Sequence, residues 1–171
     1  QNKMESYDGK GQTATYVYDG TGTRIGKTVN GVSTGQIWSN GNVIAEYVTR
    51  GTKSYIRGAG GEIVKTKDRA NNNRYLSYNA HGDITNIIEK NAESTSFAVT
   101  AAYEYDAFGG LVTGTGGGEA DSNAFRYNGQ YTDEETGLIY LLNRYYDPSI
   151  GGFTQEDPYW NPTNMIYGDG K

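Results

Sequence analysis

The chain has 171 residues and a net charge of −5, and its lysines and arginines never form a cluster longer than a pair, which argues against nucleic-acid binding. It contains no cysteine, which excludes disulfides, thiol catalysis and cysteine-ligated zinc, and no apolar run approaches the roughly 18 to 20 residues that span a bilayer. Its 25 glycines and 16 tyrosines predict a core of half-buried β-strands, because a tyrosine ring packs on a pleated surface while its hydroxyl reaches a polar neighbour.

A short phrase recurs along the chain: tyrosine, then aspartate or asparagine, two further residues, and glycine. It occurs at Tyr7–Gly11, Tyr18–Gly22, Tyr78–Gly82 and Tyr105–Gly109, and one residue longer at Tyr146–Gly151. In a hairpin, the tyrosine ends a strand, the acid or amide hydrogen bonds the backbone two residues on, and glycine adopts the left-handed conformation. The phrase therefore predicts hairpins whose turn-forming residues are Asp19, Gly22, Asn79, Gly82, Asp106, Gly109, Asp147 and Gly151.

Strand-like runs, most with alternating polar and apolar residues, separate these turns. Further hairpin turns are predicted at Asn30-Gly31, Asn40-Gly41, 68–73 and Asn128-Gly129. No run longer than ten residues carries a convincing helical stripe. We therefore expect an all-β fold with almost no helix, in which consecutive antiparallel hairpins form a curved or spiralling sheet. The expected strands are residues 13–18, 23–29, 36–38, 43–47, 54–57, 62–67, 74–78, 84–90, 98–105 and 110–113.

The last third of the chain is predicted to contain one loop and one long strand. Residues 113–123 are rich in glycine and have low complexity, which is typical of a flexible loop. The run 138–146 is interpreted as one buried strand, which the Asp147-Pro148 dipeptide ends because proline lacks a backbone donor. The acidic run 133–135 just before it is expected to be a solvated hairpin loop, with a calcium site as an alternative.

Four side chains have both a structural and a chemical interpretation. His81 is the sole histidine, and its place inside a repeated turn favours a hydrogen-bonding turn residue over a catalytic base. Arg144 is expected to pair with a neighbouring carboxylate or to cover tyrosine rings. Trp38 and Trp160 are candidates for stacking on sugar rings, although packing within a sheet explains such aromatic residues equally simply.

The tyrosine–aspartate turns and the phrase from Phe125 to Pro158 resemble the RHS/YD-repeat family, and this phrase is similar to its RHS-repeat-associated core. Supporting phrases are 16–24, 41–47, 79–83 and 103–109. The resemblance implies a strip of antiparallel sheet that spirals into a hollow shell around a C-terminal polymorphic toxin. Members are bacterial toxin-delivery proteins, including toxin-complex C subunits and wall-associated contact toxins, and teneurins carry a related shell.

The resemblance also implies a division of the chain and a set of partners. Residues 1–124 would be YD-repeat hairpins, with the loop at 113–123; residues 125–160 would be the core motif, and 161–171 a truncated tail. The expected partners are the C-terminal toxin domain of the same polypeptide and neighbouring repeats, with self-association through open sheet edges. Secretion or a bacterial cell-surface location is expected, with no cofactor, metal or nucleic acid.

The family's core is similar to an aspartic self-protease that releases the toxin. By motif position, Asp157 matches a catalytic aspartate and Arg144 the arginine needed for cleavage; two carboxylates that share a proton could act as base and acid. The family's second aspartate lies in a later Asp-Pro-x-Gly-Leu phrase that this chain lacks, and Gly152 stands where arginine is usual. We therefore expect a structural, non-enzymatic segment, with half of a self-cleaving site or a glycan-binding module as alternatives.

Overall fold

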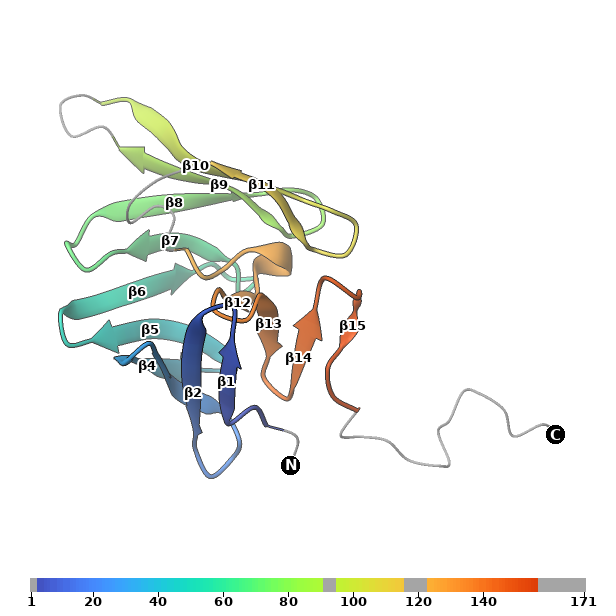
Figure 1. Ribbon diagram of the computed structural model, residues 1–171. Helices are drawn as coiled ribbons and strands as arrows, with labels where there is room; N and C mark the ends of the chain where they lie inside the picture. Colours follow the sequence, from blue (N-terminus) through green and yellow to red (C-terminus); the bar gives the residue numbers. More distant parts are fainter. Residues whose placement is uncertain (1–2, 91–94, 116–122, 157–171) are drawn as a thin grey trace.

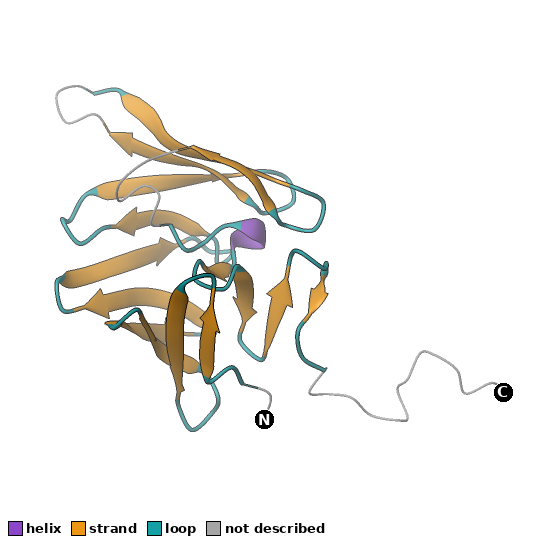
Figure 2. Cartoon of the chain, viewed as in Figure 1, coloured by secondary structure: helices purple, strands orange, loops and turns teal. Residues whose placement is uncertain are grey.

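The computed structural model describes residues 3–90, 95–115 and 123–156. Its larger sheet has eleven strands, each paired antiparallel with the next in sequence, which confirms the expected all-β fold of consecutive hairpins (Figure 1, Figure 2). The strands are β1 (Ser6–Gly9), β2 (Gln12–Tyr18), β3 (Arg24–Val29), β4 (Val32–Ser39), β5 (Asn42–Val48), β6 (Gly51–Arg57), β7 (Ile63–Lys67), β8 (Asn73–Tyr78), β9 (Ile84–Lys90), β10 (Phe97–Tyr105) and β11 (Leu111–Thr115).

A smaller, four-stranded sheet follows a single turn of 3₁₀ helix, η2 (Tyr127–Gly129). The large sheet curves like the letter C from β1 and β2 to β10 and β11, and the small sheet stands in the opening of the C (Figure 1). The Tyr145 hydroxyl lies 2.9 Å from that of Tyr18 near one end of the curve, and the Tyr146 hydroxyl donates to the Phe108 carbonyl (2.9 Å) near the other. The small sheet comprises β12 (Tyr131–Asp133), β13 (Leu138–Leu141), β14 (Arg144–Asp147) and β15 (Gly152–Phe153).

One backbone hydrogen-bond pattern closes many of the hairpins. After β2, the Asp19 N–H donates to the Thr23 carbonyl (2.9 Å), and the Gly22 N–H donates back to the Asp19 carbonyl (3.0 Å), with Gly22 at φ 94°. This is a three-residue hairpin loop with a left-handed closing residue, a position that favours glycine or asparagine. The same pattern closes residues 58–62, 68–72, 79–83, 106–110 and 126–130.

The two-residue loops follow the Asn-Gly prediction. Asn30 and Asn40, and the glycine after each, all have positive φ angles, and they join strands paired in tight register, so both predicted hairpins are confirmed. The interpretation of Tyr7–Gly11 as a tyrosine–aspartate turn was wrong. Tyr7 and Asp8 lie inside β1, and the loop is Lys10-Gly11, because Gly9 already pairs with Gln12.

The last third of the chain corrects two further expectations. The run 138–146 forms two strands, β13 and β14, because Leu141 pairs with Arg144 across a tight turn at Leu142-Asn143. Leu142 adopts φ 62° there, and no glycine or proline in the sequence indicates the turn. The predicted loop at 113–123 begins later than expected, since residues 113–115 continue β11 and pair with β10.

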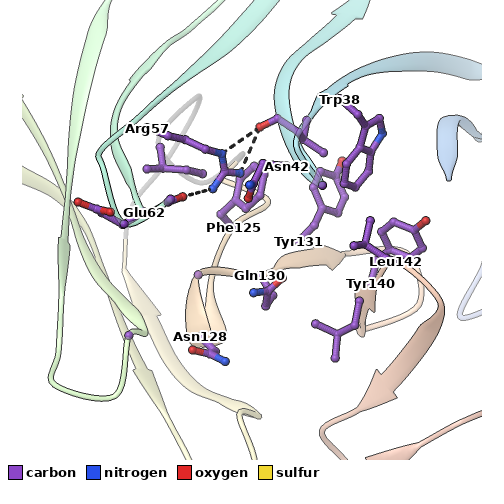
Figure 3. A pocket seen from close by; sticks show the side chains of 18 of the residues that line it. Trp38, Asn42, Arg57, Glu62, Phe125, Asn128, Gln130, Tyr131, Tyr140 and Leu142 are labelled. Carbon is purple, nitrogen blue, oxygen red and sulfur yellow. Dashed lines mark hydrogen bonds between the residues drawn. The ribbon is translucent and has the colours of Figure 1, made fainter. Parts of the chain in front are cut away.

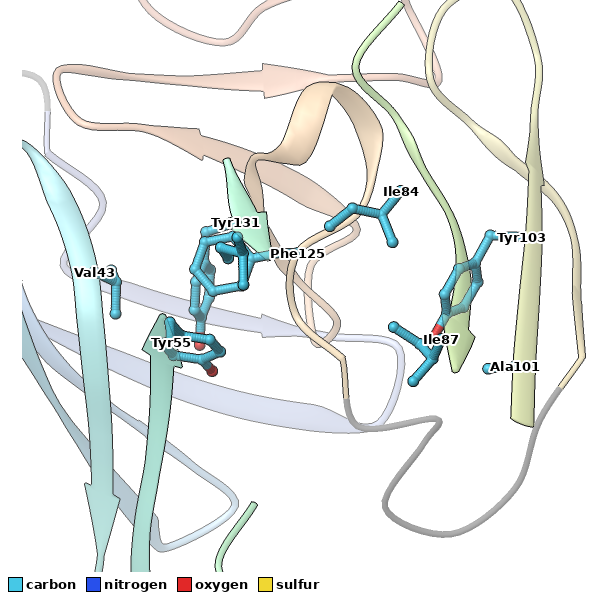
Figure 4. Close-up of a cluster of buried hydrophobic side chains, with 9 residues drawn as sticks. Val43, Tyr55, Ile84, Ile87, Ala101, Tyr103, Phe125 and Tyr131 are labelled. Atoms are coloured by element: carbon cyan, nitrogen blue, oxygen red, sulfur yellow. The ribbon is translucent and has the colours of Figure 1, made fainter. Parts of the chain in front are cut away.

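Strand alternation determines which side chains meet between the sheets. Val43 in β5 faces inward and is fully buried, whereas its neighbour Ile44 is exposed on the outer face. The apolar core therefore lies between the inner face of the large sheet and the start of the small one. It comprises Val43, Tyr55, Ile63, Ile84, Ile87, Ala101, Tyr103, Phe125 and Tyr131 (Figure 4). Across the described ranges, no helix has the length and apolar character that crossing a membrane requires.

Candidate functional site

A buried arginine lies where the two sheets meet. Arg24, the first residue of β3, has no solvent exposure, and its guanidinium carbon lies 4.2 Å from the ring centre of Tyr140 and 5.1 Å from that of Tyr131. Its Nη1 donates to the Asp133 carboxylate and to the Tyr145 hydroxyl (3.3 Å). The desolvated Arg24 guanidinium is thus held by aromatic rings and by a paired carboxylate, and the small sheet supplies most of these groups.

Lys27 extends this pair into a cluster of two cations and two carboxylates. Its Nζ lies 2.8 Å from Asp133 Oδ1 and 2.9 Å from Glu135 Oε2. The Tyr16 hydroxyl donates to Glu135 Oε1 (2.9 Å). Both cations come from β3 of the large sheet, whereas both carboxylates come from the small sheet and the turn that follows β12, so the cluster fastens one sheet to the other.

The protonation states follow from this arrangement. Burial alone would raise the pKa of the Asp133 carboxyl, but the charges and hydrogen bonds of Arg24 and Lys27 outweigh it and hold the pKa below its ordinary value. Burial raises the pKa of the Tyr16 hydroxyl, and the nearby carboxylates of Asp133 and Glu135 raise it further. Asp133 is therefore an ionised carboxylate near neutral pH, and the Tyr16 phenol is a protonated donor.

A third carboxylate continues the polar contacts across the inner face. Glu46 in β5 is buried and accepts hydrogen bonds from the hydroxyls of Tyr55 and Tyr131 and from Gln36 Nε2 (3.3 Å). Gln36 Oε1 in turn accepts from Arg24 Nε (3.3 Å). Arg24 and Glu46 are thus linked through one amide, although among the described residues Arg24 Nη2 is buried without a hydrogen-bond partner.

The expectation of a solvated acidic loop at 133–135 was wrong for two of its three residues. Asp133 and Glu135 are almost fully buried, and cations already occupy their carboxylates, whereas the Glu134 side chain between them is 54% exposed. Strand alternation could not have shown this, because β12 ends at Asp133 and both Glu134 and Glu135 lie in the turn that follows. Nothing in the sequence pointed to Arg24, because arginine is common at exposed strand positions.

Arg144 lies on β14, which pairs with β15. Its guanidinium carbon lies 3.7 Å from the ring centre of Phe153, so it covers a phenylalanine where tyrosine was expected. The Tyr145 N–H donates to Gln155 Oε1 (2.6 Å), so the chain that leads toward Asp157 passes beside the strand of Arg144. Asp157 and Trp160 themselves lie outside the described residues, as does the tail 161–171.

The predicted turn acids and amides accept hydrogen bonds from their own loops. Oδ1 accepts from the backbone N–H two residues on in Asp19 (2.9 Å), Asn79 (3.0 Å), Asp106 (2.8 Å) and Asp147 (2.9 Å). The glycines that close these loops have positive φ, with values of 94° for Gly22, 95° for Gly82, 88° for Gly109 and 62° for Gly151.

His81 and Trp38 both take part in contacts within the fold. His81 Nδ1 lies 3.0 Å from Asp83 Oδ1, which also accepts from the Asn128 N–H (2.8 Å) and so links the turn to η2, just before the small sheet. Trp38 Nε1 donates to the Arg24 carbonyl (2.6 Å), and its ring meets that of Tyr140 edge-on. Within the described ranges, no group of three or more histidine or carboxylate side chains is arranged to hold a metal ion.

Comparison with known proteins relates the sequence to bacterial nucleases. No protein-family model matches the chain. It is 39% identical over 150 residues to the tRNA3(Ser)-specific nuclease WapA of Bacillus spizizenii and 41% identical over 149 residues to the tRNA nuclease WapA of Bacillus subtilis. Each match covers 85% of this chain, and the chain spans only 6% of the length of these relatives.

Solved structures show the same fold in toxin proteins. The TcdB2–TccC3 complex matches with a TM-score of 0.62 and 21% identity, over 89% of this chain and 8% of the matched chain. A Photorhabdus luminescens Tc holotoxin pore matches with a TM-score of 0.55 and 19% identity, over 90% of this chain and 8% of that one. The chain thus has an RHS-like β-fold, like that of TccC3, and its sequence is related to the WapA nucleases of Bacillus.

Proposed function

We propose that this chain is a segment of the wall of a β-shell in a longer bacterial RHS/YD-repeat protein, and that the shell encloses a C-terminal toxin domain of the same polypeptide. The observation that carries the proposal is the small sheet standing in the opening of the curved large sheet, held there by the buried cluster of Arg24, Lys27, Asp133 and Glu135. Such an arrangement closes one side of a curved wall. The likeness to TccC3 and WapA supports a toxin-associated segment.

The edges of the large sheet support continuation of the wall. Among the described residues, β1 and β11 each pair with one strand only, which leaves a row of backbone donors and acceptors on each outer edge. Neighbouring repeats would pair there in the longer protein, whereas the isolated chain would self-associate through the same edges. We assign no turnover to this chain. The nuclease activity in the names of its relatives would belong to another part of a secreted or surface-bound protein.

Protease protection in the longer natural protein tests the shell. The polypeptide downstream of this segment is expected to resist added protease in the folded protein and to be digested at least about tenfold faster in the Asp133→Asn variant, because a loosened small sheet opens the wall. Glu134→Gln, one residue away and on the surface, serves as the matched control and should leave protection unchanged. If the downstream polypeptide is digested at the same rate in all three proteins, the result counts against enclosure by the shell.

We also propose, as a second function, that Arg144 and Asp157 form half of an aspartic self-cleavage site. The favouring observation is that β15 pairs with the strand of Arg144 and leads, through Gln155, toward Asp157. In that mechanism one carboxylate activates water while its partner protonates the scissile carbonyl, and the arginine charge tunes their shared proton. The second carboxylate would come from sequence beyond this chain.

Intact mass and gel mobility of the longer protein test the cleavage. The wild type is expected to appear as two fragments and Asp157→Asn as one uncut chain, because an amide cannot take up the proton that the carboxylate must accept. The shell proposal survives either result. Cleavage of both proteins, or of neither, would remove Asp157 from any catalytic role.

A further inference from the structure

A hollow of about 520 Å³ lies between the turn tips of the large sheet and the edge of the small sheet (Figure 3). The turns before β5, β7 and β9 form one side, and η2, β12 and β13 form the other. Its volume lies within the range of small-molecule sites. Large apolar side chains at its border are those of Trp38, Ile63, Tyr78, Phe125, Tyr131, Tyr140, Leu141 and Leu142. Phe125, Tyr131 and Tyr140 are only 3–5% exposed, whereas Trp38 and Tyr78 are half-buried and Leu142 is exposed.

The polar ends of the lining rings are already satisfied by the protein. Trp38 Nε1 donates to the Arg24 carbonyl, the Tyr78 hydroxyl donates to the Ile63 carbonyl (2.8 Å), and the Tyr131 hydroxyl donates to Glu46. The Tyr140 hydroxyl accepts from the Arg24 N–H (3.0 Å). The ring surface that reaches the hollow is therefore carbon, and the half-buried rings of Trp38 and Tyr78 supply most of it.

The polar groups at the border come from both sides of the hollow. The side-chain amides of Asn128 and Gln130 border the hollow, and neither hydrogen bonds to another of the residues that the structure describes. The Arg57 guanidinium also lines it, but this group already donates to the carbonyls of Val43 (3.1 Å) and Gly61 (2.6 Å). Glu62 adds one exposed carboxylate. The border of the hollow thus offers amide donors and acceptors and a carboxylate acceptor, while the Arg57 guanidinium is already engaged.

Leu142 forms part of the rim at a conformational cost. Its φ of 62° lies in the left-handed region, which is sterically unfavourable for a bulky side chain. Its side chain is 38% exposed and lies beside Gly41 of the turn before β5. Glycine or asparagine would relieve the strain but would remove the apolar rim, so strain and exposure both indicate that the hollow requires a carbon surface at this point.

We propose that this hollow binds a neutral sugar, with one or two residues of a glycan seated between the rings and the amides. A pyranose presents C–H groups on its faces and hydroxyls around its rim, which matches a site whose border combines aromatic carbon with free amides and a carboxylate. An acetamido sugar adds an amide and a methyl group that suit the same mixed border. This binding is independent of the proposed shell, and either can hold without the other.

A glycan array, followed by calorimetric titration of the whole chain with N,N′-diacetylchitobiose and maltose, tests the site. Saturable binding of at least one neutral glycan is expected, with an affinity at least about tenfold weaker in Gln130→Ala, because one hydrogen bond to a ligand hydroxyl contributes about a factor of ten. The matched control is Thr15→Ala, an exposed strand position remote from the hollow. Far-UV circular dichroism checks that both variants fold.

Two results would overturn the proposal. One is the absence of binding to any neutral glycan on the array and to both disaccharides. The other is binding that Gln130→Ala and Thr15→Ala leave equally unchanged, since the sugar would then sit elsewhere. Asn128→Gly provides a second variant in the hollow, and it keeps the left-handed backbone that Asn128 adopts at φ 49°.

Discussion

The Asp133→Asn substitution is expected to lower the free energy of unfolding by about 3–5 kcal/mol, because it leaves the guanidinium of Arg24 buried without its counter-charge. Both side chains have no solvent exposure, so water cannot replace the lost carboxylate. Lys27 also loses one of its two carboxylate partners. Chemical denaturation followed by tyrosine and tryptophan fluorescence measures the change.

The neighbouring acid provides the matched control. Glu134 pairs with Arg126 at 2.6 Å, but its side chain is 54% exposed, so Glu134→Gln is expected to cost no more than about 1 kcal/mol. The two substitutions change charge equally and lie one residue apart. If both lower the unfolding free energy by the same amount, the buried cluster does not hold the sheets together, and net charge alone explains the loss.

The same carboxylate determines how stability responds to acid. Because the folded-state pKa of Asp133 lies below its ordinary value, its stabilising contribution is fully present above the unfolded-state pKa of about 3.9 and is lost as pH falls through the folded pKa. Denaturation curves at descending pH should therefore show a smaller acid loss of stability in Asp133→Asn than in the wild type. If the wild type and Asp133→Asn lose stability equally as pH falls, the pKa of Asp133 is the same in the folded and unfolded states.

Turn chemistry was sufficient to predict most of the large sheet. The loop from Asp19 to Thr23 combines local hydrogen bonds with a glycine at positive φ, and Asn30-Gly31 places two residues suited to positive φ side by side. Such signals are contained in a few consecutive letters. The turn at Leu142-Asn143 was not predicted because it lacks such a signal. A leucine in the left-handed conformation has no local signal, because contacts from distant parts of the chain must hold it there.

The buried cluster could not be predicted because its partners are far apart in the sequence. Arg24 and Asp133 meet only when the small sheet enters the opening of the large one, and 109 positions separate them. The acidic run 133–135 spans the end of β12 and the turn after it, so its spacing does not indicate that Asp133 and Glu135 point inward. The Tyr16 hydroxyl shows the same limit, since the tyrosine was assigned to a packed strand but its acceptor, Glu135, was not foreseen.

The apolar side of the same joint depends on Phe125, and Phe125→Ala is expected to lower the free energy of unfolding by about 3–5 kcal/mol. The ring is 3% exposed, and its centre lies 4.8 Å from that of Tyr55 in the large sheet and 5.3 Å from that of Tyr131 in the small one. Its removal leaves a cavity between two sheets that are held apart by their other contacts, so the site cannot fully collapse.

Phe97→Ala tests whether burial at the joint, rather than the loss of any phenylalanine, causes the effect. Phe97 lies on β10, is 58% exposed and meets the Tyr75 ring edge-on on the outer face, so its loss should cost about 1 kcal/mol or less. Both variants are compared with the wild type by thermal and chemical denaturation. If both variants lose the same free energy of unfolding, the hairpins themselves stabilise the fold. The expected difference instead indicates that packing between the small sheet and the curved sheet stabilises it.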